Sequence, residues 1–158
     1  MIQDILPHRY DVSYHPERTP ERRSFLLLVS REGVLFAERD GAFTLPRFSD
    51  FETEALPFKS LCQKARYLFQ IDRDYFFLLP PSALPAGKLG EGYRFLGPTE
   101  LRDLKPQHLA FAAITSTQLY RFYDQRKFCG RCGEKMTHAE EERAMCCKHC
   151  GLIEYPKI

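Results

Sequence analysis

The hydrophobic positions of the chain fall into short apolar runs separated by turn residues, which predicts a domain rich in strands. The run at residues 24–30 (SFLLLVS) is almost wholly apolar, and after the turn at 31–33 the run at 34–38 continues as a second strand. These two runs predict a β-hairpin. Further strands are predicted at residues 42–45, 67–71, 75–79 and 93–96, and the strands at 67–71 and 75–79 form a second hairpin around the turn at 72–74.

Helical spacing is weaker in the first half of the chain than in the second. Residues 51–69 have a loose helical pattern that Pro57 interrupts, which predicts a helix from about Lys59. Residues 99–104 predict a helical turn capped by Thr99. A longer helix is predicted from Pro106 to Arg126, because a proline fits the first turn and apolar residues recur at helical spacing after it.

Proline, glycine and charge mark the segments between these elements. Residues 1–23 contain three prolines and alternate at Tyr10, Val12 and Tyr14, which predicts a loose arm or an edge strand. Residues 80–92 are rich in proline and glycine and predict a loop. The expected fold class is therefore α+β. We expect a mixed α/β domain with β-hairpins at 1–105, a connecting helix at 106–127 and a small zinc ribbon at 128–158.

The composition is that of an ordinary globular protein and does little to narrow the function. Hydrophobic residues make up 44% of the chain and charged residues 28%, with a formal net charge of +2, so bulk charge points to neither nucleic acid nor membrane. No stretch approaches the ~18 consecutive apolar residues of a membrane span, and the first residues lack a basic head followed by an apolar run. These features predict a cytoplasmic protein without a membrane partner.

The cysteines carry the clearest chemistry. Five of the six fall within residues 129–150, and Cys62 stands alone. In a chain without a secretory leader, two CxxC pairs at this separation indicate metal ligation rather than disulfides. The predicted zinc ligands are Cys129, Cys132, Cys147 and Cys150.

Each pair is a knuckle in which a tight turn directs two sulfurs to one point, and a glycine follows its second cysteine. The spacer of fourteen residues between the pairs is long enough for a β-hairpin. Four sulfurs close a tetrahedron without an open position, so the zinc is expected to be structural. Cys146 could replace Cys147 in a CxxxC pair, and His138 and His149 are alternative ligands. We favour Cys147, because CxxCG then repeats, and expect Cys146 and Cys62 to be packed thiols.

The residues from 118 onward read QLYRFYDQRKFCGRCGEKM, then EERAMCCKHC, then EYPKI. This pattern closely resembles the zinc ribbon of the NADH pyrophosphatase (NAD-capped RNA decapping) family of Nudix hydrolases. The resemblance implies an NAD(H) diphosphatase that cleaves NADH or NAD⁺ to NMN(H) and AMP. Its substrate would be NAD(H) or the NAD-capped end of an RNA.

In that family a Nudix domain follows the ribbon and binds Mg²⁺ or Mn²⁺ with the glutamates of an REUxEExG core. The 158 residues contain no such core, and the acidic run at 140–142 lacks its arginine and glycine. We therefore expect this chain to bind zinc, to act as a scaffold in a homodimer and to contribute part of the substrate site, without hydrolysing substrate by itself.

Two substrate-binding positions follow from the resemblance. Glu142 lies five residues before the third cysteine, where the family has an acidic substrate ligand. Tyr155 precedes the terminal proline of the ribbon, where the family has an aromatic residue that stacks on a base in a site completed across a dimer. Arg47 and Arg102 fall near further family positions, but we expect them to be ordinary surface arginines.

An alternative function is a stand-alone zinc-ribbon module that binds nucleic acid or a protein. Seven basic side chains lie in and just before the ribbon with four aromatic ones among them, as in nucleic-acid interfaces, although acidic residues nearly cancel the charge.

Overall fold

The computed structural model describes residues 1–85 and 89–157, and its backbone divides into two compact units. The first is Met1–Thr117 and the second begins at Gln118. The boundary falls inside α4 (Gln107–Gln125), which is the helix predicted from Pro106 to Arg126. The three-part division of the chain at 105 and 127 remains a prediction.

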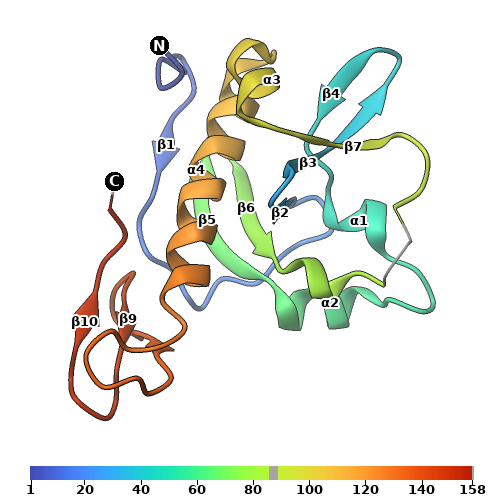
Figure 1. The fold of residues 1–158 in the computed structure, drawn as a ribbon. Coiled ribbons are helices and arrows are strands. Elements are labelled where there is room, and N and C mark those ends of the chain that lie inside the picture. Colours follow the sequence, from blue (N-terminus) through green and yellow to red (C-terminus); the bar gives the residue numbers. More distant parts are fainter. Residues whose placement is uncertain (86–88, 158) are drawn as a thin grey trace. The chain divides into compact units, whose positions relative to one another are not determined.

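Within the described residues of the first unit, seven strands form one sheet (Figure 1). They are β1 (Tyr10–Asp11), β2 (Phe25–Ser30), β3 (Gly33–Arg39), β4 (Ala42–Thr44), β5 (Arg66–Ile71), β6 (Asp74–Leu79) and β7 (Tyr93–Leu96). The order across the sheet is β1-β5-β6-β2-β3-β4, and β7 also pairs with β3. Both predicted hairpins, β2–β3 and β5–β6, are confirmed as antiparallel pairs.

The centre of the sheet is a parallel pair that the hydrophobic pattern does not predict. Strand β2 lies beside β6 in parallel, with Phe25 opposite Phe76 and Leu28 opposite Leu79. Both strands are apolar at almost every position because both of their faces are covered.

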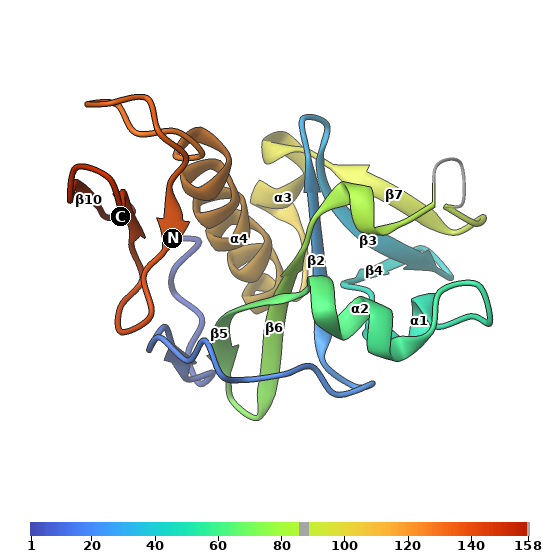
Figure 2. The same cartoon turned by 90° about the horizontal axis from the view of Figure 1, so that it is seen from below.

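Helices cover the two faces of this sheet (Figure 2). Helices α1 (Phe48–Phe51) and α2 (Phe58–Lys64) lie on one face, and the part of α4 up to Thr117 lies on the other. Under α1 and α2 the core contains Phe48, Leu61 and Phe77, all with no exposed surface.

Two sequence-based expectations need correction or extension. The helical turn expected to be capped by Thr99 is α3 (Pro98–Asp103), and its cap is Gly97, whose N–H donates to Glu100 Oε2 at 2.9 Å. Pro98 begins the helix because its fixed φ suits the first position. Helix α1 was not predicted. The predicted loop at 80–92 contains the 3₁₀ turn Pro81–Ala83, and its residues 86–88 lie outside the described part of the chain.

The N-terminal arm is attached to the edge of the sheet, which confirms the predicted edge strand. Strand β1 pairs with β5, with Tyr10 opposite Ile71. The Arg18 guanidinium donates to Tyr67 Oη at 2.7 Å and lies 4.5 Å from the ring centroid of Tyr75. An exposed arm of this composition is therefore ordered by cation–π and hydrogen-bond contacts.

The second unit contains a three-stranded antiparallel sheet in the order β10-β9-β8. Its strands are β8 (Thr137–His138), β9 (Met145–Cys146) and β10 (Ile153–Glu154). Strands β8 and β9 form the hairpin predicted for the spacer between the cysteine pairs. The mixed sheet with helices and the four-cysteine ribbon confirm the predicted α+β class. None of the described helices is long and apolar enough to cross a membrane.

Candidate metal centre and the adjoining Tyr155–Glu142 pair

The two cysteine knuckles have the same backbone geometry. In the first, Cys129 N–H donates to Glu134 O at 2.7 Å and Gly133 N–H donates to Cys129 O at 2.9 Å. In the second, Cys147 N–H donates to Leu152 O at 2.8 Å and Gly151 N–H to the carbonyl of Cys147 at 2.9 Å. Each turn closes at a glycine in the left-handed region.

These two glycines are the residues after the second cysteine of each pair. Gly133 has φ +79° and Gly151 has φ +78°. A residue with a Cβ is strained in this region, so the CxxCG spacing has a backbone cause. The repeated turn brings all four sulfurs to one place.

The four Sγ atoms lie within 4.8 Å of one another. Cys129 Sγ is 3.5 Å from Cys150 Sγ, and Cys132 Sγ is 3.5 Å from Cys147 Sγ. A tetrahedral zinc with Zn–S bonds of about 2.3 Å needs sulfurs roughly 3.8 Å apart, so this cluster fits the ion. Cys129 and Cys147 are also buried, at 4% and 2% exposure.

Ionisation of the thiols also favours a cation at this point. Backbone N–H groups of the first knuckle, that of Cys132 foremost, lower the pKa of Cys129 to about 6. The N–H of Glu134 favours the thiolate of Cys132, but burial and the thiols of Cys147, Cys150 and Cys129 outweigh it and raise the pKa of Cys132 to about 12. Four thiolates at these distances repel one another unless a cation neutralises them.

The alternative ligands lie outside this cluster. Cys146 is in strand β9, where its Sγ is 3.5 Å from Thr137 Oγ1, as expected for a strand residue. His138 packs its ring edge-on against Tyr123 at 4.9 Å, and His149 is exposed. The described residues thus form one sulfur cluster, which contains Cys147 and excludes Cys146.

A small apolar cluster supports the sulfurs. It contains Phe122 from the last turns of α4 together with Met136 and Met145, and Tyr123 and Leu152 pack against it. The ribbon residues therefore enclose the sulfurs on the side away from solvent, although they bury few large side chains.

The two positions inferred for substrate binding touch each other. Tyr155 Oη donates a hydrogen bond to Glu142 Oε1 at 2.9 Å, and the Tyr155 side chain is 54% exposed. The bond to Glu142, followed by desolvation, raises the pKa of Tyr155. Next to Tyr155, Glu154 forms an ion pair with Arg126, a contact that no sequence signal suggested.

The remaining candidate side chains have local structural contacts. The Arg47 guanidinium lies over the Phe25 ring at 4.0 Å and is 3.7 Å from Asp74 Oδ1. Arg102 is an exposed residue of α3. Burial raises the pKa of the Cys62 thiol, so a thiolate nucleophile is disfavoured there.

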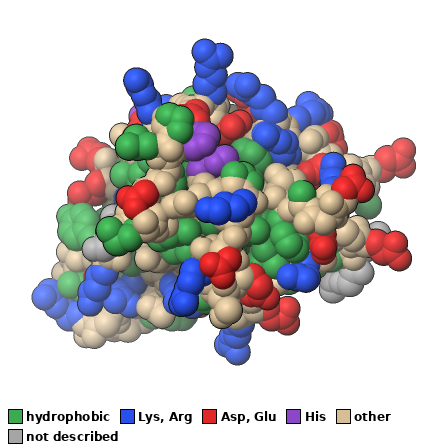
Figure 3. Space-filling model, turned by 90° about the horizontal axis from the view of Figure 1, so that it is seen from above, with side chains coloured by type: hydrophobic (Ala, Val, Ile, Leu, Met, Phe, Trp, Pro, Cys, Tyr) green, Lys and Arg blue, Asp and Glu red, His purple; other side chains and the backbone are tan. Residues whose placement is uncertain are grey.

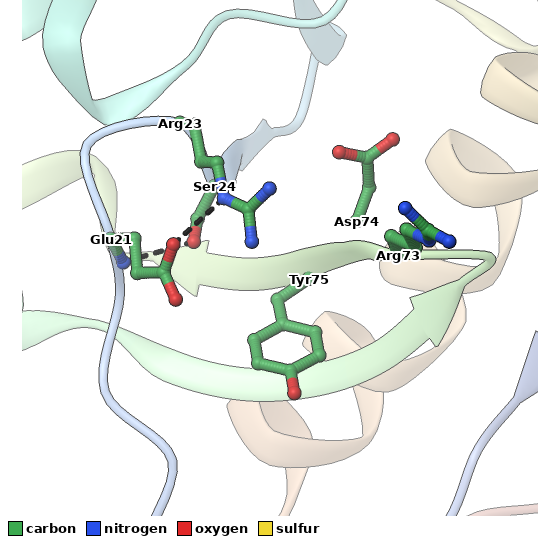
Figure 4. A pocket seen from close by; sticks show the side chains of 6 residues that line it. All are labelled: Glu21, Arg23, Ser24, Arg73, Asp74 and Tyr75. Atoms are coloured by element: carbon green, nitrogen blue, oxygen red, sulfur yellow. Dashed lines mark hydrogen bonds and ion pairs between the residues drawn. The ribbon is translucent and has the colours of Figure 1, made fainter.

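A cavity in the first unit is too small for a nucleotide. It has a volume of about 10 Å³, room for about one water molecule. The residues around it are charged or polar and already paired in part: Arg23 with Glu21, and Ser24 with the Glu21 N–H (Figure 4). Acidic and basic side chains are also interspersed over the face drawn in Figure 3. This face therefore lacks the broad basic patch that would bind a polyanion such as a nucleic acid.

Comparison with known proteins agrees with the geometry of the ribbon. Residues 124–155 match the NADH pyrophosphatase zinc ribbon domain. The resemblance inferred from the cysteine pattern is thereby confirmed for this zinc ribbon. The match begins at Asp124 and extends to Tyr155, so it includes both knuckles and the Tyr155–Glu142 pair.

The curated proteins that are similar to this chain are named as NAD-capped RNA hydrolases. The NAD-capped RNA hydrolase NudC of Deinococcus radiodurans is 35% identical over 80 residues, which cover 50% of this chain and 29% of the relative. The NudC proteins of Pseudomonas fluorescens and Klebsiella pneumoniae are 42% identical over 43 residues and 49% identical over 41 residues. Those two matches cover 27% and 26% of this chain and 16% of each relative. The matched region thus spans less than a third of the length of these relatives.

Proposed function

We propose that this chain supplies the zinc ribbon and part of the substrate site of an enzyme that hydrolyses the pyrophosphate of NAD(H) or of an NAD-capped RNA. The observation that carries the proposal is the match of residues 124–155 to the NADH pyrophosphatase zinc ribbon, together with relatives named as NAD-capped RNA hydrolases. In this proposal Mg²⁺ or Mn²⁺ and the hydrolytic carboxylates belong to a Nudix domain outside these 158 residues.

Zinc in the ribbon has a structural role in this proposal. Cys129, Cys132, Cys147 and Cys150 would hold it, and four sulfurs leave no position for a reacting water. The cluster geometry supports this assignment because the sulfurs are already at coordination distances. The ion would replace the large apolar core that the ribbon lacks.

Tyr155 and Glu142 are the proposed substrate contacts. A half-exposed tyrosine ring offers a stacking face to a base, worth about 1–3 kcal/mol. The carboxylate of Glu142 accepts hydrogen bonds from ribose hydroxyls or an amide. The structure supports a joint role, because the two side chains lie in contact.

A homodimer is a further part of the proposal. Ile153 and Tyr155 are two residues apart on the edge strand β10 and its continuation, and both are about half exposed, at 47% and 54%. Residues at this spacing share a face of a strand, so they present apolar surface together. We also propose a cytoplasmic location and the division of the chain at 105 and 127.

The experiment that tests the base-binding role follows Tyr155 directly. The zinc-loaded chain with ¹³C-labelled tyrosine is titrated with NMN, AMP and NADH, and the Tyr155 signal is assigned from the spectrum of Tyr155→Phe. We expect a selective shift of that signal, and Phe128→Ala is the control because Phe128 is a different exposed ring of the ribbon, at 65%. A Tyr155 signal unmoved by all three nucleotides at millimolar concentration contradicts the role.

A second assay tests where the hydrolysis takes place. Residues 1–158 are incubated with NADH and Mg²⁺, and NMNH and AMP are measured. We expect no release from this chain alone, because the described residues contain no carboxylate cluster of metal-binding geometry. Mg²⁺-dependent release by these residues would show that the chemistry is not confined to a Nudix domain.

One observation favours the alternative of a nucleic-acid-binding module. Arg131 and Lys148 belong to the two knuckles, at one end of the β8–β9 hairpin, where Glu134 is the accompanying acid; the turn at the other end carries the acidic run at 140–142 and Arg143. Binding of a single-stranded RNA without an NAD cap, with a steep dependence on salt, would support this function instead.

A further inference from the structure

We propose that Glu142 is a positioning residue that acts through Tyr155, and that the two side chains recognise a base as one unit. This inference rests on the proposed function and narrows one part of it, because Glu142 fixes the Tyr155 ring in place of making its own contact with the ligand. The observation that carries it is the hydrogen bond from Tyr155 Oη to Glu142 Oε1, at 2.9 Å.

The Tyr155–Glu142 hydrogen bond lies at the end of a very short strand pairing, on the side away from the second knuckle. Strands β9 and β10 pair through only two positions, Cys146 with Ile153 and Met145 with Glu154. One end of this ladder is fixed by the second knuckle, where Cys147 N–H donates to Leu152 O at 2.8 Å. At the other end the chain runs on into Tyr155, beyond the last pair. A two-residue edge strand frays unless a side chain holds its end.

Two side-chain contacts, to two different parts of the ribbon, hold the C-terminal end of β10. Glu154 forms an ion pair with Arg126, just after helix α4, and Tyr155 bonds to Glu142 in the turn between β8 and β9. The residue before Tyr155 is therefore held by Arg126, and the Tyr155 hydroxyl is held by Glu142. The Tyr155 ring is 54% exposed, and the contact at its hydroxyl restricts its orientation.

Confinement of the ring lowers the cost of stacking a base on it. Ordering a mobile side chain on binding costs conformational entropy, and a ring fixed beforehand avoids most of that cost. A phenol that donates to a carboxylate makes a charge-assisted hydrogen bond, which is stronger than a neutral one. Glu142 thus improves binding without having to touch the ligand.

The pair also sets which bases suit the site. The carboxylate of Glu142 places an acidic group beside the Tyr155 ring, with Oε1 at 2.9 Å from the phenol oxygen. A ring that bears its own carboxylate is repelled. The pair therefore selects nicotinamide over nicotinate.

The test measures the contact and its effect on binding separately. In the zinc-loaded chain, the ¹³C signal of the Tyr155 phenol is titrated with base in wild type, Glu142→Gln and Glu142→Ala, each checked for equal zinc content. We expect Tyr155 to ionise at a higher pH in wild type than in Glu142→Ala. Identical titration curves would overturn the proposal, whatever the ligand experiments show.

Binding of NMN and of nicotinic acid mononucleotide is then measured on the same proteins. We expect Glu142→Ala and Tyr155→Phe each to weaken NMN binding roughly 2- to 10-fold, as for one lost hydrogen bond. The double variant should be no weaker than the worse single variant, because both remove the same bond. Glu142→Gln should recover part of the NMN affinity and lose the discrimination against nicotinic acid mononucleotide.

The outcomes separate this inference from the proposed function. If Tyr155→Phe and Glu142→Ala weaken NMN binding by factors that multiply in the double variant, Glu142 is an independent contact and the positioning role is wrong. If the titration of Tyr155 depends on Glu142 but no nucleotide moves the Tyr155 signal, the pair exists and the proposed base-binding function is wrong.

Discussion

The two units of this chain reach an ordered state by different means. In the first, a seven-stranded sheet buries phenylalanine and leucine on both faces, and Phe36, Phe69 and Leu68 have no exposed surface. In the second, the strands have two residues each, and the buried set consists largely of sulfur-bearing side chains. One unit is stabilised by apolar area, whereas the other needs an ion that four cysteines can bind.

This difference predicts which unit a given substitution should destabilise. Loss of a buried ring should weaken the first unit and leave the metal cluster in place, and loss of a cysteine should do the reverse. The predictions below test this separation.

The largest effect is expected from Cys147→Ser. Removing one of four ligands should abolish tight zinc binding, which is worth on the order of 10 kcal/mol in small zinc modules, and should unfold the ribbon. The measurements are zinc content per chain and the dispersion of ribbon amide signals. Cys146→Ser is the matched control, since Cys146 is the adjacent residue but lies outside the sulfur cluster. Equal zinc loss in both variants would refute the ligand assignment.

Next in size is Phe77→Ala, in the core of the first unit. Phe77 has no exposed surface and its ring packs edge-on against Phe48 at 5.9 Å, so we expect a loss of about 3–5 kcal/mol in the free energy of unfolding. Urea denaturation measures the loss, and bound zinc should be unchanged. Phe128→Ala, which removes a ring that is 65% exposed, should cost less than about 0.5 kcal/mol. Comparable losses would mean that burial does not distinguish these rings.

Two glycines with a positive φ, Gly33 in β3 and Gly41 in the turn between β3 and β4, provide the third test. Gly33 has φ +136°, and a Cβ there would lie 2.0 Å from Leu96 O, so Gly33→Ala must displace β7 from β3. We expect a cost of about 1–3 kcal/mol or more, seen as a lower midpoint of urea unfolding. Gly41 also has a positive φ, but a Cβ there would meet nothing within 4 Å. Gly41→Ala should therefore cost less, and the opposite order would contradict the steric argument.

The smallest expected effect is a loss of folding stability at low pH, caused by His108. Burial, followed by the charge of the neighbouring His8, lowers the pKa of His108 from its usual 6.5, against the opposite pull of Asp72 and Asp74. The unfolded chain therefore binds a proton at a higher pH than the folded one, and stability falls as the pH drops below about 6.5. The two histidine rings lie 4.0 Å apart, centroid to centroid.

The measurement is urea unfolding at pH 7.5 and pH 5.5. Wild type should lose more stability between these values than His108→Gln, which cannot titrate. The pKa of Asp72 is also lowered, first by the Arg9 N–H and then by His8, but that contribution is lost only below pH 3.8 and does not enter this window. Equal losses in the two proteins would exclude His108 as the source.

Local patterns in the sequence predicted local structure well. The CxxCG repeats identified the four clustered sulfurs because each knuckle closes within five residues, and the two hairpins follow from apolar runs around short turns. Helix α4 was predicted because nineteen residues are enough to show a helical period. Helix α1, with four residues, is too short to show one.

Long-range pairing could not be predicted in the same way. Strands β2 and β6 are both continuous apolar runs, and nothing in their pattern states that they pair with each other in parallel. The Tyr155–Glu142 bond depends on the register of β9 and β10, which a two-residue ladder does not reveal in the sequence. The resemblance to a known ribbon marked both residues, but only the structure shows that they touch.

Helix α4 has a practical consequence for dissecting the chain. Its last turns contribute Phe122 and Tyr123 to the cluster around the sulfurs, and Gln118 begins the unit to which they belong. A peptide cut just before the first knuckle would keep the four cysteines of the sulfur cluster and yet lose Phe122 and Tyr123, which pack against that cluster. The smallest autonomous piece of the ribbon is thus expected to include the final turns of α4, and excising it requires a break within a helix.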